Sequence, residues 1–291
     1  MSGLEKCVCD AVMTAGAGSC ALLDAASLTP MLDERQREKL ETAVPGWRGI
    51  LCAVVPYYAG DGEKADETQP RMSRYAWGKD YHVVVTRILE AGAAILREAG
   101  WKAAVWTDAS PIPEVWAAAA CGLGVIGGNG LLLTGEWGSW VFIGCMATDA
   151  PLEFPSAREI GSCIGCGACV RACPVGAIVG GRVDAESCLS AVSQRGGMLT
   201  PREEALMREN GIIWGCDRCQ EICPVNRNAR QTGIMDFRKN LLYTIPISVR
   251  EATSRKDLCT KWPDRAFTWK GVRVLQRNLG LFEQEKETKP V

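Results

Sequence analysis

One run of cysteines near the middle of the chain constrains its fold more than any other feature. The run reads Cys163-Ile-Gly-Cys166-Gly-Ala-Cys169-Val-Arg-Ala-Cys173-Pro174 and has the CxxCxxCxxxCP spacing of bacterial ferredoxins. In this spacing three thiolates bind one iron–sulfur cluster, and the fourth, which precedes proline, commonly binds a second cluster. The run therefore predicts two clusters in a segment rich in Gly and Pro, with little room for long helices or strands.

A second cysteine string supplies most of the other ligands. The string Cys216-Asp-Arg-Cys219-Gln-Glu-Ile-Cys223-Pro224 lacks one cysteine of the full run, and Cys188 restores the total to the eight that two [4Fe-4S] clusters need. The motif predicts crossed ligation, with Cys163, Cys166, Cys169 and Cys223 on cluster one, and Cys173, Cys188, Cys216 and Cys219 on cluster two. A zinc ribbon also uses paired CxxC motifs, but two strings that end in CP favour iron–sulfur clusters.

Composition limits the remaining chemistry. The 291 residues include fifteen cysteines and a single histidine, His82. In a reducing cytosol clustered cysteines more often bind metal than form disulfides, and one imidazole excludes a centre built from several histidines. The seven other cysteines lack ligand spacing and are expected to be small core residues, with Cys7 and Cys9 as an exposed, oxidisable pair; these seven are Cys7, Cys9, Cys20, Cys52, Cys121, Cys145 and Cys259.

Hydropathy and charge bear on location and partners. Neither a signal sequence in the first thirty residues nor any run of about 18 apolar residues is found, so we expect a cytoplasmic, monomeric protein without a membrane partner. Net charge is 33 − 34 = −1, but residues 224–291 carry 14 basic and 7 acidic side chains. A polyanion would meet this tail, although a solvated helical face is the alternative.

The chain divides by composition into three sections of an α+β protein. Residues 1–155 predict a mixed α/β domain, residues 156–226 a ferredoxin-like domain for two [4Fe-4S] clusters, and residues 227–291 a short basic helical tail broken at Pro246 and Pro263. Within the first section we expect strands at 50–58, 102–107 and 140–148, helices at 32–44 and 81–99, and a surface loop at 59–70.

The first section must do more than carry electrons, because a carrier needs only the cysteine segment. Three of its segments stand out: residues 73–82, residues 107–114 and the glycine-rich residues 122–144. Asp108 directly follows a β-rich run, the strand-end position where sheet enzymes often place a catalytic group. A simple turn cap is the alternative interpretation for Asp108.

At these residues the chain resembles the epoxyqueuosine reductases, cobalamin-dependent iron–sulfur enzymes of queuosine tRNA maturation. The similarity spans about residues 47–280 and includes RYxxGxDYH at Arg74–His82, the DAxP-type segment from Asp108 to Glu114, and the eight cysteines. Further matches are the glycine segments at 121–128 and 138–145, DAxxCxS at Asp184–Ser190, and GCDxCQxxCPxN ending at Asn226.

The resemblance implies a base-off cobalamin between the first domain and the clusters, electrons that pass through both clusters to cobalt, and reduction of an epoxide to an alkene. Asp108 matches the family's proton donor, and His82 is expected near the site without binding cobalt. The resemblance also implies tRNA as a partner, which would bind the basic tail, and a flavodoxin- or ferredoxin-type protein as the electron donor. The segments that line cobalamin in the family correspond here to Ser73, Arg74, Asp80, Tyr81, Leu132, Ile143 and Ser190.

Departures from the family pattern leave the substrate open. This chain has Gly128 where the family has a lysine, Val115 where it has a basic residue, and Cys145 where it has a glutamate. The helical-repeat domain that binds tRNA in longer members is expected to be missing. Two alternatives therefore stand beside epoxyqueuosine reduction: a related cobalamin and iron–sulfur reductase with another small substrate, or a ferredoxin-like electron-transfer protein without cobalamin.

Overall fold

The computed structural model describes residues 3–61 and 69–282, so part of the loop expected at 59–70 lies outside the described residues. In chain order, with η for 3-10 helices, the elements are α1 Gly3–Ala15, β1 Ser19–Asp24, α2 Ala25–Leu28, η1 Thr29–Met31, α3 Glu34–Ala43, β2 Gly49–Pro56, β3 Arg71–Met72, η2 Arg74–Ala76, α4 Tyr81–Glu98, β4 Ala103–Thr107, α5 Glu114–Ala120, β5 Val125–Ile126, β6 Leu132–Leu133, β7 Val141–Thr148, α6 Ala168–Ala172, β8 Ile178–Val179, β9 Arg182–Val183, α7 Leu189–Gln194, α8 Pro201–Glu209, β10 Ile212–Trp214, α9 Arg218–Glu221, η3 Pro224–Asn226, η4 Met235–Phe237, η5 Ile247–Glu251, α10 Arg255–Lys261, η6 Ala266–Lys270 and α11 Val272–Leu281.

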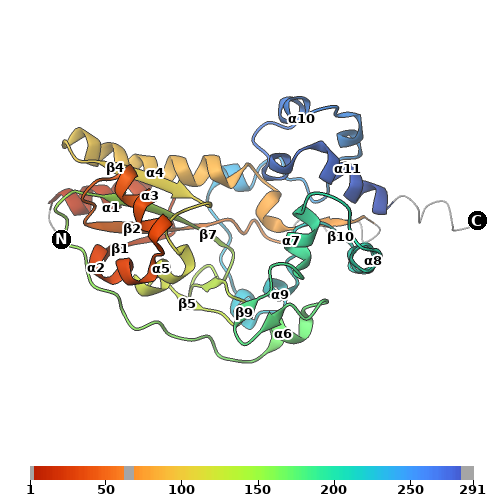
Figure 1. Cartoon of the computed structure of the whole chain (residues 1–291), viewed down its shortest axis with the longest axis horizontal. Coiled ribbons are helices and arrows are strands. Elements are labelled where there is room, and N and C mark those ends of the chain that lie inside the picture. The colour runs from red at the N-terminus through yellow and green to blue at the C-terminus, as the bar shows by residue number, and fades with distance from the viewer. Residues whose placement is uncertain (1–2, 62–68, 283–291) are drawn as a thin grey trace, which may run out of the picture.

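A four-stranded antiparallel sheet forms the centre of the N-terminal half (Figure 1), in the order β1-β2-β7-β4. The three strands expected in this half are confirmed as β2, β4 and β7, with ends shifted by one or two residues. Strand β1 was not predicted from the sequence. Its six residues mix small and apolar side chains, and pairing with β2 along its whole length makes them a strand.

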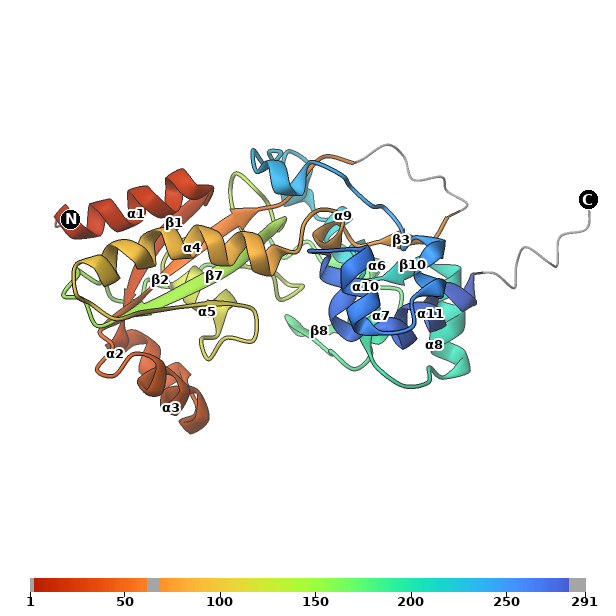
Figure 2. The same ribbon diagram turned by 90° about the horizontal axis from the view of Figure 1, so that it is seen from above.

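Helices cover both faces of the sheet (Figure 2). The strand β2 is buried throughout and alternates between two cores: Leu51, Ala53 and Val55 pack with α1 and α4, whereas Ile50, Cys52 and Val54 pack with α2, α3 and α5. Burial on both faces explains the unbroken apolar sequence of this strand. The two predicted helices are confirmed as α3 and α4.

A short segment between β2 and α4 leaves the sheet and joins the C-terminal half. Strand β3 pairs in parallel with β10, and Met72 and Trp77 share a core with Trp214 and Phe267. Residues 71–77 therefore pack with the C-terminal half, although in the sequence they lie within the first section. Apolar side chains near residue 75 could have filled either core, and only the three-dimensional arrangement shows which core they enter.

The tail consists of short helices rather than long ones, with Pro246 directly before η5 and Pro263 just after α10. Some of its positive charge is used internally, because Arg265 donates to the carbonyl groups of Trp77 and Gly78 and Arg277 donates to that of Arg195. Burial lowers the pKa of both guanidinium groups. Within residues 3–61 and 69–282, no helix is long and apolar enough to cross a bilayer.

Candidate active site and cluster-binding segment

Asp108 lies where strand β4 ends, as the sequence predicted. The chain turns through Asp108 and Ala109 with φ angles of 59° and 41°, a left-handed conformation that costs non-glycine residues about 1–3 kcal/mol each. Lys39 Nζ holds the turn by donating to the Ala109 carbonyl at 2.9 Å. The turn leaves the Asp108 side chain 62% exposed at the mouth of a pocket.

Two residues at the start of α4 surround the Asp108 carboxylate. Tyr81 donates its hydroxyl hydrogen to Asp108 Oδ2 at 2.6 Å, and burial raises the pKa of Tyr81, so the hydroxyl stays a donor. His82 Nε2 lies 3.8 Å from the same oxygen, and His82 Nδ1 lies 2.8 Å from Asp80 Oδ1. The bond to Asp80 raises the pKa of His82. His82 is thus held between two carboxylates.

The pocket beside Asp108 has a volume of about 280 Å³ and largely apolar walls. Tyr81 stacks on Phe142 with ring centroids 4.4 Å apart, and Leu132 and Ile143 complete this wall. Glu114, the first residue of α5, also lines the pocket. Such a pocket suits a flat apolar group on one side and a proton donor on the other.

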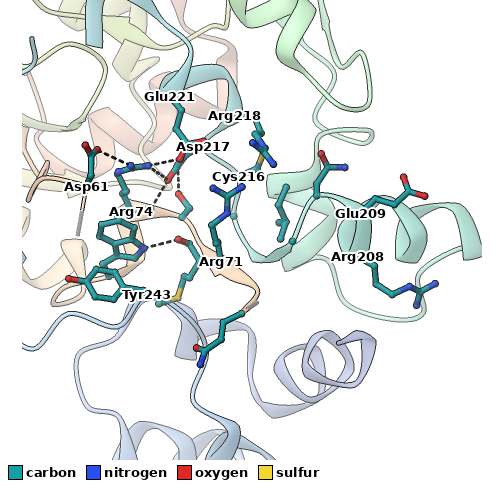
Figure 3. Close-up of a pocket in the computed structure, with 18 residues that line it drawn as sticks. Asp61, Arg71, Arg74, Arg208, Glu209, Cys216, Asp217, Arg218, Glu221 and Tyr243 are labelled. Carbon is teal, nitrogen blue, oxygen red and sulfur yellow. Dashed lines mark hydrogen bonds and ion pairs between the residues drawn. The ribbon is translucent and has the colours of Figure 1, made fainter. Parts of the chain in front are cut away.

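A buried acidic residue in the second cysteine string joins this string to the segment before α4 (Figure 3). Asp217 accepts hydrogen bonds from the Ser73 hydroxyl at 2.6 Å and from the Arg74 backbone N–H at 2.7 Å. The Arg74 guanidinium, only 12% exposed, also pairs with Glu221 at 2.8 Å and with Asp61 at 3.3 Å. Burial raises the pKa of Asp217, and the hydrogen bonds from Ser73 and Arg74 offset part of that rise. No local pattern indicates this pairing, because the residues are 143 or 144 positions apart in the chain.

We expect Asp217→Ala to lower the free energy of unfolding by about 3 kcal/mol, because it leaves the buried Ser73 hydroxyl and the Arg74 backbone N–H without their acceptor. Urea unfolding monitored by tryptophan fluorescence measures the change. The matched control is Asp61→Ala, which removes an exposed partner of the same arginine and should cost less than about 1 kcal/mol. Equal losses in the two variants would contradict the structural role of Asp217.

A second set of hydrogen bonds connects the loop before β7 with the second cysteine string. Asn226 accepts the Ser139 backbone N–H at 2.7 Å and donates to the Ser139 hydroxyl, which itself donates to Gln220 Oε1 at 2.9 Å. A Cβ atom on Gly138, whose φ is 59°, would lie 2.1 Å from Asn226 Oδ1. Glycine is therefore required at 138 so that the cysteine string can pack against this loop.

The residues expected to contact cobalamin divide into groups in the structure. Tyr81, Leu132 and Ile143 line the Asp108 pocket, and Asp80 caps α4 beside it. Ser73 and Arg74 instead bond Asp217 and line a separate, larger cavity of about 560 Å³ that includes Cys216. Ser190 lies in α7, where its carbonyl accepts from Gln194, which in turn accepts from the Tyr75 hydroxyl.

Neighbouring segments place hydrogen-bond donors next to two of the cysteines that the sequence predicts as cluster ligands. The Gly128 N–H donates to Cys163 Sγ and the Ala177 N–H to Cys173 Sγ, both at 3.3 Å. Burial raises the pKa of Cys169, and the charges of Cys163 and Cys223 raise it further. Burial likewise raises the pKa of Cys216 to about 11 and of Cys219 to about 12, and the charge of Cys188 contributes to both increases. Cys166 is exposed, whereas burial dominates at Cys216 and Cys219.

The other cysteines follow the prediction only in part. Cys52, Cys121 and Cys145 are buried between the sheet and α5, with 3.6 Å between the sulfur atoms of Cys52 and Cys145. Cys259 is exposed, which corrects its assignment to the core, because its neighbour Leu258 takes the buried position of the short helix α10. The Cys20 thiol donates a hydrogen bond to the Cys9 carbonyl at 4.0 Å, and of the pair expected to be exposed Cys7 is exposed whereas Cys9 is half-buried.

Two segments match known protein families. Residues 37–109 match the family described as epoxyqueuosine reductase QueG, DUF1730, and residues 162–226 match the 4Fe-4S double cluster binding domain. An epoxyqueuosine reductase of Lactococcus garvieae is 33% identical over 85% of this chain and 71% of its own length. The chain belongs to the epoxyqueuosine reductase family. The epoxyqueuosine reductase of Gloeobacter violaceus is 37% identical over 70% of this chain, and the match spans 64% of that relative's length.

Solved structures of this family share the fold. An epoxyqueuosine reductase crystallised with an epoxyqueuosine-modified tRNA-Tyr stem loop is 22% identical, with a TM-score of 0.81, and covers 96% of this chain and 80% of its own. The Streptococcus thermophilus enzyme has a TM-score of 0.79 at 22% identity, with 97% and 81% covered. The mixed α/β architecture beside a [4Fe-4S] cluster-binding segment is therefore that of the family.

Proposed function

We propose that the chain reduces epoxyqueuosine in tRNA to queuosine as a cobalamin-dependent reductase that receives electrons through two [4Fe-4S] clusters. The observation that carries the proposal is the position of Asp108, which lies at the mouth of an apolar pocket in a chain of this family. We further propose that the chain binds tRNA and that a flavodoxin- or ferredoxin-type protein donates the electrons.

The eight cysteines are proposed as crossed ligands of the two clusters. Support comes from which cysteines lie near enough to affect each other's pKa. The charges of Cys163 and Cys223 raise the pKa of Cys169, and the charge of Cys188 raises the pKa values of Cys216 and Cys219. The N–H groups of Gly128 and Ala177 would stabilise negative charge on the bound clusters. Exposure of Cys166 makes cluster one the proposed entry point for electrons.

The pocket beside Asp108 partly fits the cobalamin that the family implies. Tyr81, Leu132 and Ile143 offer a flat apolar wall for a corrin, whereas Ser73 and Arg74 are already bonded to Asp217. We therefore propose the first three residues as direct contacts and the other two as supports of the cluster segment. Bound cobalamin supplies the low-potential metal centre that passes electrons to the substrate.

Reduction of the epoxide consumes two electrons and two protons, breaks both C–O bonds, and forms a C=C bond and water. We propose that Asp108 protonates the departing oxygen, because its carboxyl is accessible from the pocket. Tyr81 orients the carboxyl through its 2.6 Å hydrogen bond, and Lys39 holds the turn that presents it. His82 stabilises the negative charge that remains on Asp108 afterwards.

Anaerobic reconstitution with iron, sulfide and hydroxocobalamin tests the proposal. We expect about eight irons and one cobalt per chain, and conversion of epoxyqueuosine to queuosine in an anticodon stem loop under dithionite and methyl viologen, read by mass spectrometry of nucleosides. Binding of iron without cobalt would instead indicate an electron carrier. Cobalt binding without conversion would indicate another substrate.

A further inference from the structure

Glu114 is a carboxyl of the Asp108 pocket that has no role in the steps above. It begins helix α5 and lines the pocket together with Asp108 and Tyr81. Its Oε1 atom is shielded from solvent and has no hydrogen-bond partner among the residues that the structure describes. An ionised carboxylate in this position would leave the buried Oε1 atom without a donor, so the neutral acid is favoured.

The hydrogen-bond pattern of Asp108 is the opposite. Its Oδ2 accepts from the Tyr81 hydroxyl at 2.6 Å, and its Oδ1 accepts from the Ala109 N–H at 2.9 Å. The two carboxyls of the pocket thus differ: both oxygens of Asp108 accept hydrogen bonds, whereas Glu114 Oε1 has no hydrogen-bond partner among the described residues.

The charged and titratable neighbours of Glu114 agree with this difference. Burial and the Asp108 charge raise the pKa of Glu114 to about 7, although the Asp108 backbone N–H and His82 of α4 offset part of the rise. From β7 the neighbour is Cys145, a thiol whose own pKa the Glu114 charge raises. No lysine or arginine lines the pocket within the described part of the chain, and residue 115 is valine.

The proposed reaction consumes two protons, and Asp108 delivers them one at a time, the first taken up from solvent before the substrate closes the mouth of the pocket. We infer that Glu114 stores the proton that recharges Asp108 within the pocket, so that the second proton reaches the departing oxygen while the substrate closes the mouth to solvent. The proton moves from the Glu114 carboxyl to the Asp108 carboxylate, and solvent reloads Glu114 after the product leaves. This inference rests on the proposed function.

The kinetic test compares Glu114→Gln with Glu114→Asp and with Glu98→Gln, an exposed control at the end of α4. In the wild type, kcat should fall as pH rises through about 7, because Glu114 then loses its proton. Glutamine should lower kcat at least about tenfold, leave KM unchanged and abolish this descending limb, since an amide cannot supply the proton. Aspartate should restore the limb in part. A Glu114→Gln enzyme with the wild-type rate and pH profile would overturn the inference.

An infrared measurement on the reconstituted protein without substrate separates this inference from the proposed function. We expect a protonated-carboxyl C=O band in the wild type at about pH 5.5 that is lost by about pH 8.5 and is absent in Glu114→Gln. Absence of the band in the wild type, or its persistence in the variant, would overturn the inference. If the wild type shows the band but does not convert epoxyqueuosine, the proposed substrate is wrong and the proton-holding role of Glu114 stands.

Discussion

Asp108→Asn should lower kcat for epoxyqueuosine reduction by about 10³-fold, because an amide cannot protonate the departing oxygen. Asparagine has nearly the same shape, and its carbonyl oxygen can still accept the hydrogen bond from Tyr81, which is 2.6 Å long in the wild type. Iron and cobalt contents should therefore stay at the wild-type level. Single-turnover assays with the reconstituted enzyme and the modified stem loop measure the rate.

Asp10→Asn is the matched control, because Asp10 is an exposed aspartate on α1, away from the pocket. Its rate should equal that of the wild type. If Asp108→Asn retained a rate within about tenfold of the wild type, Asp108 would be no proton donor, and its left-handed turn would serve the shape of the pocket alone.

Cys188→Ala should reduce the iron content from about eight to about four per chain and abolish turnover, because a [4Fe-4S] cluster with three protein thiolates is labile. The control is Cys121→Ala, which changes a buried thiol packed against α5 and the sheet. The control should keep its full iron content. Equal iron loss in both variants would mean that Cys188 is not the eighth ligand.

The same experiment tests crossed ligation. By electron paramagnetic resonance, Cys173→Ala and Cys188→Ala should perturb one cluster signal, and Cys169→Ala and Cys223→Ala the other. If Cys173→Ala instead perturbed the signal that depends on Cys169, each string would bind its own cluster. The crossed assignment would then be wrong, whereas the total of eight ligands would still hold.

Local spacing in the sequence was enough for the cluster segment and for much of the sheet. Thiolates spaced three residues apart can bind one cluster, so this local spacing predicts the cluster segment without information from the rest of the chain. Residues 162–226 match a double-cluster domain. Likewise β2, β4, β7, α3 and α4 follow from hydrophobic runs and helix-end signals a few residues long. The strand-end position of Asp108 follows from the same local pattern.

Tertiary structure alone decided how these parts meet. The pairing of Asp217 with Ser73 and the contact of Ser139 with Asn226 join residues 144 and 87 positions apart. The different surroundings of Asp108 and Glu114 arise where a turn, two helices and a strand converge. Short-range spacing determines which residues can share a cluster or a helix face. By contrast, burial and hydrogen bonding between distant segments depend on packing of the whole chain, and they determine which carboxyl keeps a proton.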